Sequence, residues 1–148
     1  MDFRDTPEEA AFRQEVREFI AQEAPKIEGG AEADLISNYA QVFVRSQSWF
    51  KKLGEKRWIA PAWPKEYGGA GMTVMQQFIF NEEMAAARAP RPLHLIIGVG
   101  MAGPTLIVHG TEEQKKFYLP RILSGEDIWS QGFSEPEAGS DLASLRTR

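Results

Sequence analysis

Three threonines, Thr6, Thr73 and Thr111, each stand three positions before a Glu or a Gln. In such a capping box, the Thr side chain accepts the N–H of the later residue, and the Glu or Gln side chain accepts the Thr N–H in return. The arrangement marks the first turn of a helix. Pro7 strengthens the first box, since proline suits the first helical position. Three helix starts in one short chain predict a mainly helical fold.

Apolar residues recur at helical spacing behind these starts. The first helix is expected to end within residues 24–30, which contain Pro and Gly, and a second helix is predicted over residues 32–56. The helix behind Thr73 should end near residues 88–90, and the helix behind Thr111 should end at Gly125. Pro120 inside this last helix predicts a kink or a break, because proline lacks an N–H.

Two further segments belong to the helical part. Residues 93–108 are apolar on nearly all sides, which is typical of a buried helix, or of two helical pieces broken near Gly103 and Pro104. Residues 57–72 form a loop rich in Pro, Gly and aromatic residues. We expect this loop to pack against the helices, with Trp58 and Trp63 as its anchors, because large rings gain from burial.

The last part of the chain changes in character. Residues 128–134 resemble a short β-strand, and residues 135–141 are typical of a turn-forming loop. One strand cannot form a sheet by itself. The residues therefore predict a helical domain, residues 1–126, followed by the beginning of a second domain, residues 127–148.

Composition narrows the functions open to the chain. Its 17 Lys and Arg face 21 Asp and Glu, and the net charge of −4 argues against a nucleic-acid binder, because phosphate contacts need clustered cations. With no Cys and two His, the chain offers no disulfide, no thiol catalysis and no evident metal site. It shows neither a signal peptide nor an apolar stretch of about 20 residues, so we expect a cytoplasmic protein without a membrane span.

One compact loop, residues 132–144, combines the hydroxyls of Ser134 and Ser140 with the rigid Pro136 and the permissive Gly139. Such a loop can present hydroxyls and N–H groups to a ligand, and a helical turn beginning at Asp141 would offer its amides to an anion such as a pyrophosphate. The alternative is an ordinary surface turn in which Ser140 or Asp141 caps a short helix, and composition alone favours it.

Residues 132–144 resemble the first signature of the acyl-CoA dehydrogenase family at every defined position. Residues 64–71 resemble the family's loop between its second and third helices, and residues 110–115 resemble the start of its fifth helix. The resemblance implies an all-α fold, an orthogonal bundle of about five to six helices, with the first strand of a β domain at the C-terminal end.

The resemblance also implies an FAD-dependent enzyme that oxidises an acyl-CoA to a trans-2-enoyl-CoA. In the family a carboxylate removes the α-proton, and the β-hydride passes to N5 of the flavin. The implied partners are the acyl-CoA substrate, an electron-transfer flavoprotein, and further subunits in a homodimer, a homotetramer or a hetero-oligomer.

The signature implies cofactor contacts at six positions. The backbone of the first four would bond the pyrimidine edge of the flavin, and the Ser134 hydroxyl would lie near N5, where a hydrogen bond favours electron density. Ser140 matches a residue that also contacts the pantetheine part of the substrate, and Gly139 gives the backbone room to approach. Glu135 and Asp141 are interpreted as structural. The implied cofactor-binding residues are Gln131, Gly132, Phe133, Ser134, Gly139 and Ser140.

Other positions favour plainer roles. The helix at residues 93–103 would suit the lining of an acyl pocket, with Gly98 and Gly100 leaving space, but core packing is the favoured interpretation. His94 is expected to make a structural contact rather than to take part in chemistry.

No catalytic residue is assigned in this chain, because the family's catalytic Glu has no counterpart in its 148 residues. We expect the chain to be the N-terminal part of a dehydrogenase, inactive by itself. Two alternatives stay open: one piece of an enzyme that another chain completes, and a non-catalytic helical interaction module. The acidic residues that do not substitute for the base are Glu112, Glu113, Glu135 and Glu137.

Overall fold

The computed structural model describes residues 4–26 and 39–147. Short 3₁₀ turns lie at Lys65–Tyr67, Leu93–Leu95 and Leu142–Ser144, and a π-helical turn lies at Gly98–Ala102. The expected all-α fold is confirmed for the described residues. Their five α-helices are α1 (Pro7–Glu23), α3 (Tyr39–Glu55), α4 (Val74–Ala86), α5 (Gly103–His109) and α6 (Glu112–Ser124).

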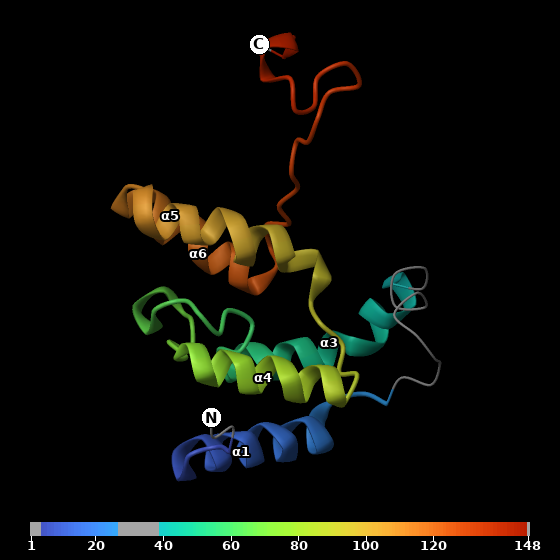
Figure 1. Ribbon diagram of the computed structural model, residues 1–148, viewed down its shortest axis with the longest axis vertical. Coiled ribbons are helices and arrows are strands. Elements are labelled where there is room, and N and C mark those ends of the chain that lie inside the picture. Colours follow the sequence, from blue (N-terminus) through green and yellow to red (C-terminus); the bar gives the residue numbers. More distant parts are fainter. Residues whose placement is uncertain (1–3, 27–38, 148) are drawn as a thin grey trace.

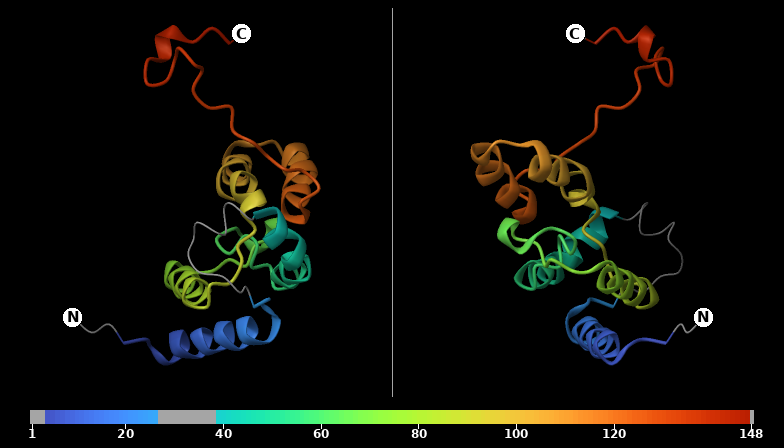
Figure 2. Two further views of the ribbon diagram at one scale, coloured as in Figure 1. Left: turned by 90° about the vertical axis from the view of Figure 1, so that its right-hand side faces the viewer. Right: turned by 60° about the vertical axis from the view of Figure 1, so that its left-hand side comes forward.

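The helices are stacked in tiers along the long axis of the molecule (Figure 1). The helix α1 lies against one side of the α3 and α4 pair, and α5 and α6 lie beyond the other side. Figure 2 shows α1 crossing helices that are seen nearly end-on, as expected for an orthogonal bundle. A C-terminal tail, residues 126–147, runs away from the α6 end of this helical body.

All three expected capping boxes form. At α1, the Thr6 N–H donates to the Glu9 carboxylate at 2.8 Å, and the Glu9 N–H donates to the Thr6 hydroxyl at 3.3 Å. Each box satisfies two N–H groups that the helix itself leaves unpaired. The starts of three helices are therefore fixed locally. The two further boxes pair Thr73 with Gln76 and Thr111 with Gln114.

The left-handed residues that follow α3 and α4 were not foreseen, although both helices end close to the predicted positions. After α3, the Trp58 N–H donates to the Leu53 carbonyl at 2.7 Å and the Arg57 N–H donates to the Gly54 carbonyl at 2.8 Å. This pair of bonds is the Schellman motif, and it places Arg57 at a φ of 61°. Arg88 takes the same place after α4, with a φ of 50°. Both helices therefore stop at a left-handed residue that is usually glycine.

The second predicted helix is described from Tyr39 onward, and residues 27–38 lie outside the described part of the chain. The apolar residues of α4 do not all face the core. Val74 and Phe78 are exposed, whereas Ile79, Phe80 and Met84 are buried. The helix α6 continues through Pro120, so the predicted break does not occur there.

Two clusters of buried side chains form the core. Trp58 lies in the first, edge-on to Phe12, Phe19 and Phe80. Trp63 lies in the second, where its indole N–H donates to the Val99 carbonyl at 2.9 Å. Both rings anchor the 57–72 loop as expected. The first cluster includes Val16, Ile20, Trp49, Leu53, Phe80, Met84 and Leu95, and the second includes Ala60, Trp63, Leu119 and Ile122.

The predicted strand at residues 128–134 is wrong. Within the described residues this segment has no strand partner, and the tail contains only an isolated bridge between Glu135 and Ala138. A strand requires a neighbour for its N–H and C=O groups, and the described part of the tail finds none.

The prediction for residues 93–108 is also corrected. Ile96, Met101 and Val108 are exposed, so the segment is not buried on all sides. No break occurs at Gly103 and Pro104, because α5 begins there directly after the π-helical turn. Proline fits this position, since its missing N–H falls in the first turn of α5.

Candidate functional site

The run of residues 131–134, which the family signature marks for cofactor binding, lies in the tail (Figure 1). All four residues are exposed, and the Phe133 side chain is 79% accessible to solvent. No heavy atom lies within 4 Å of the place where a Cβ on Gly132 would stand. The backbone of this run is therefore open to a ligand.

A turn brings two of the predicted site residues together. The Ala138 N–H donates to the Glu135 carbonyl at 3.2 Å, which folds the chain back over Pro136. A Cβ on Gly139 would lie 3.6 Å from the Ser134 Oγ. Ser134 and Gly139 are thus neighbours in space, and Ser140 follows them, exposed.

The expected helical turn after Asp141 is a single 3₁₀ turn, Leu142–Ser144. Its Ser144 N–H donates to the Asp141 carbonyl at 3.3 Å, and the Ser144 hydroxyl donates to the Asp141 carboxylate. The Asp141 side chain makes no capping bond to this turn. Asp141 therefore stabilises the loop through Ser144, as expected for a structural residue.

The Glu135 carboxylate accepts three hydrogen bonds from the end of the tail. The Arg146 N–H donates to Oε2 at 2.9 Å, the Thr147 N–H donates to Oε1 at 2.7 Å, and the Thr147 hydroxyl donates to the same Oε1. These bonds, the Thr147 hydroxyl first, hold the pKa of Glu135 below its ordinary value of 4.5. No sequence pattern indicated Thr147 as the partner of Glu135.

The helix suggested as an acyl-pocket lining is packed closely where it meets the rest of the body. A Cβ on Gly98 would stand 2.9 Å from Ile122 and 3.3 Å from Trp129, and one on Gly103 would overlap the Trp63 ring. Both glycines therefore allow close packing. Gly100 is exposed and has nothing within 4 Å of its Cβ position.

His94 packs against two aromatic rings, with centroid distances of 4.7 Å to Phe43 and 5.5 Å to Phe50. Burial lowers the pKa of His94. A neutral imidazole between rings suits the structural contact that we expected.

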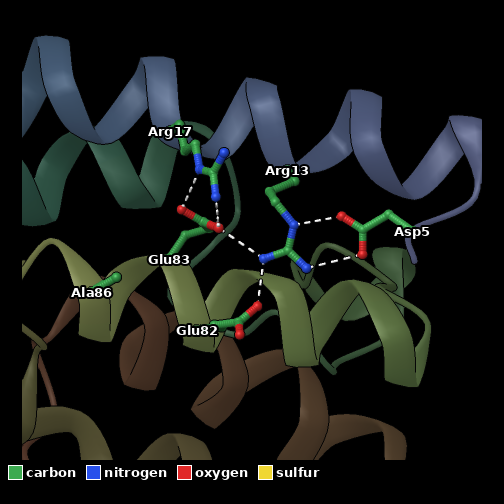
Figure 3. Close-up of a pocket in the computed structure, with 6 residues that line it drawn as sticks. All are labelled: Asp5, Arg13, Arg17, Glu82, Glu83 and Ala86. Carbon is green, nitrogen blue, oxygen red and sulfur yellow. Dashed lines mark hydrogen bonds and ion pairs between the residues drawn. The ribbon is translucent and has the colours of Figure 1, made fainter. Parts of the chain in front are cut away.

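The hollow between α1 and α4, of about 410 Å³, is lined by charges (Figure 3). Arg13 lies between Asp5 at 2.6 Å and Glu83 at 2.7 Å and also contacts Glu82, while Arg17 donates to Glu83 at 2.7 Å. The hydrogen bonds from Arg17 and then Arg13 hold the pKa of Glu83 below its ordinary value. A carboxylate so stabilised in its charged form is unsuited to take a proton from a substrate.

This charge cluster, Asp5, Arg13, Arg17, Glu82 and Glu83, therefore ties α1 to α4. Sequence reasoning missed it. The signal was the spacing of the two arginines, four residues apart on one helix face. No group of His, Asp or Glu that would suit a metal ion occurs among the residues described, and none of their helices is long and apolar enough to cross a membrane.

Comparison with known proteins identifies the family that this chain matches. The sequence profile described as "Acyl-CoA dehydrogenase, N-terminal domain" matches residues 6–126. Acyl-CoA dehydrogenase FadE26 of Mycobacterium tuberculosis is 39% identical over 142 residues, which make up 96% of this chain and 34% of FadE26. The chain thus spans about a third of the length of the curated relatives it matches.

Solved structures share both sequence and fold with the chain. A subunit of the ChsE4–ChsE5 complex from Mycobacterium tuberculosis superposes with a TM-score of 0.69 at 38% identity, over 99% of this chain and 35% of that subunit. The Tcur3481–Tcur3483 steroid ACAD gives a TM-score of 0.68 at 38% identity, over 100% of this chain and 37% of its own.

Proposed function

The chain belongs to the acyl-CoA dehydrogenase family, and from that premise we propose that it is the N-terminal part of an FAD-dependent enzyme that oxidises an acyl-CoA to a trans-2-enoyl-CoA. The observation that supports this most is the match over residues 6–126, because it covers the helical body by sequence as well as by shape. The chain spans about a third of its relatives, and we propose that the base that removes the α-proton lies outside these 148 residues, as the family resemblance implies.

The signature residues supply one wall of the proposed cofactor site. FAD, when bound, accepts the hydride that leaves the β-carbon. The exposed backbone of residues 131–134 would hydrogen-bond the flavin edge, and the Ser134 hydroxyl would donate to the ring. Gly139 lies beside Ser134 and bears no Cβ, and Ser140 next to it would contact substrate and pyrophosphate. The open polar groups of this loop fit such a ligand.

The assembly that we propose is a pair of chains. The two solved structures described above each carry the names of two proteins, ChsE4–ChsE5 and Tcur3481–Tcur3483, and the second is called a steroid ACAD. A hetero-oligomer would provide the remaining flavin wall, and electrons would leave through an electron-transfer flavoprotein. An acyl-CoA that bears a steroid fragment is the first substrate to test.

Absorbance between about 350 and 500 nm tests the cofactor, because bound flavin has bands there. We expect the isolated chain to show no turnover of acyl-CoA with an artificial electron acceptor. Turnover by this chain alone would contradict the proposal that its base lies elsewhere.

A chimera tests the proposal directly. In the ChsE4–ChsE5 complex, this chain would replace the matching third of the subunit on which it superposes. The unmodified complex is the control. We expect the chimera to retain the flavin bands and Ser134→Ala to slow their bleaching by substrate at least about tenfold. A folded chimera without flavin would refute the proposed cofactor site and favour a non-catalytic interaction module.

A further inference from the structure

We propose that Glu135 is a positioning residue: its carboxylate closes the segment from Ser134 to Thr147 and so holds Ser134 beside Gly139 before any ligand binds. The identity of that ligand rests on the proposed function. The closure itself rests only on contacts within this chain.

The geometry of the carboxylate carries the inference. Its two oxygens accept two consecutive N–H groups, from Arg146 at 2.9 Å and from Thr147 at 2.7 Å, and the Thr147 hydroxyl adds a third bond. These donors stand 11 and 12 residues further along the chain. One side chain thus joins the two ends of the loop that contains Gly139 and Ser140.

The other acidic residues of the loop have different partners. Glu137 forms an ion pair with the Arg146 guanidinium at 3.0 Å, and both side chains are mostly exposed. Asp141 accepts a hydrogen bond from the nearby Ser144 hydroxyl. Glu137, Asp141 and Arg146 are the charged groups of the loop around Glu135. Glu137 thus also reaches Arg146, but through an exposed ion pair, and among these acids only Glu135 accepts the backbone N–H groups of residues 146 and 147. Removing its acceptor atoms should therefore open the loop.

Loop closure has a consequence for binding. A ligand that must order a segment of this length binds more weakly, because ordering the chain costs conformational entropy. When the segment is already closed by Glu135, Ser134 and Gly139 are close together at the outset. Only a carboxylate accepts all three bonds, because a Gln in its place would direct an NH₂ group at one of the donors.

Amide NMR of the 148-residue chain tests the closure, with Glu137→Ala as the matched control for Glu135→Ala. In the native chain we expect the Arg146 and Thr147 N–H signals to shift as the pH falls below 4.5 and to exchange at least about fivefold more slowly than those of Gln131 and Gly132. Glu135→Ala, which removes both acceptor oxygens, should abolish both effects, and Glu137→Ala should keep them.

The contact between Ser134 and Gly139 tests positioning, because a local cap at residues 146 and 147 would not affect it. A nuclear Overhauser effect between these two residues should be present in the native chain and in Glu137→Ala, and lost in Glu135→Ala. If Glu135→Ala retains the contact, or if the two amides do not follow Glu135 in the native chain, the inference is wrong. If the closure depends on Glu135 but the chimera shows no flavin bands, the proposed cofactor site is refuted and the closure still holds.

Discussion

The helical body, residues 6–125, and the tail, residues 126–147, are stabilised by different means. In the body, large side chains such as Trp49, Leu53 and Leu119 are fully buried in two clusters. In the tail, Phe133 and Leu142 are exposed, and the loop is held by hydrogen bonds to Glu135 and Asp141. Apolar burial contributes far more free energy than exposed hydrogen bonds. A ligand can therefore reorganise the tail at little cost to the body.

The largest contrast should come from removing one ring in each region. Trp49 is fully buried, and its indole N–H donates to the Pro90 carbonyl at 2.9 Å. Trp49→Ala should lower the free energy of unfolding by about 3–5 kcal/mol, because it leaves a cavity and an unpaired carbonyl. Phe133→Ala should change it by less than about 0.5 kcal/mol. Urea unfolding followed by circular dichroism measures both, and equal losses would contradict the comparison.

The charge cluster should give the next largest effect. Glu83→Gln removes the carboxylate that Arg13 and Arg17 share, and we expect a loss of about 1–2 kcal/mol, moderated because Arg17 is exposed and Arg13 keeps Asp5. Glu15→Gln, which breaks an exposed pair with Lys56, should cost less than about 0.5 kcal/mol. A control that loses as much as Glu83→Gln would show that burial of the cluster is unimportant.

The same cluster predicts a pH dependence. Hydrogen bonds from the arginines lower the pKa of Asp5 and of Glu83 below their ordinary values of 3.8 and 4.5. Groups whose pKa is lowered on folding stabilise the fold above their unfolded pKa, and this contribution disappears as the pH falls through the folded pKa. The melting temperature should therefore fall below about pH 4.5. Glu83→Gln should flatten that fall, and an unchanged slope would refute the assignment.

The smallest effect concerns the left-handed helix end after α4. Arg88 has a φ of 50°, so Arg88→Gly should relieve strain and raise stability by about 0.5 kcal/mol. Arg91→Gly, at a neighbouring position without a positive φ, should lower stability by a similar amount, because glycine only adds freedom to the unfolded chain. Shifts of the urea midpoint in the same direction would contradict this reasoning.

The sequence was most informative where structure is decided by neighbours in the chain. The boxes at Thr6, Thr73 and Thr111 formed because donor and acceptor lie three residues apart, and Gly125 ended α6 in the left-handed conformation expected of glycine. The signature at residues 132–144 indicated the family, which the comparisons confirmed. Which residues contact the cofactor stays a prediction.

The failures concern tertiary context. Residues 128–134 have strand-forming composition, yet a strand depends on a partner from elsewhere. Phe78 follows the apolar period of α4 but is exposed, whereas Phe80 and Met84 pack with side chains of α1 in the first cluster. The charge cluster was missed because its arginines and glutamates lie about 70 residues apart in sequence. Spacing alone does not show which helices meet.

The junction between body and tail has a spectroscopic consequence. Trp129 lies edge-on to Tyr118, with ring centroids 5.7 Å apart, and its buried indole N–H has no hydrogen-bond partner in the described structure. At this separation light absorbed by the tyrosine passes efficiently to the tryptophan, and an indole without a polar partner emits at shorter wavelength than one in water. Trp129 is thus an intrinsic fluorescent reporter that would register movement of the tail without a label.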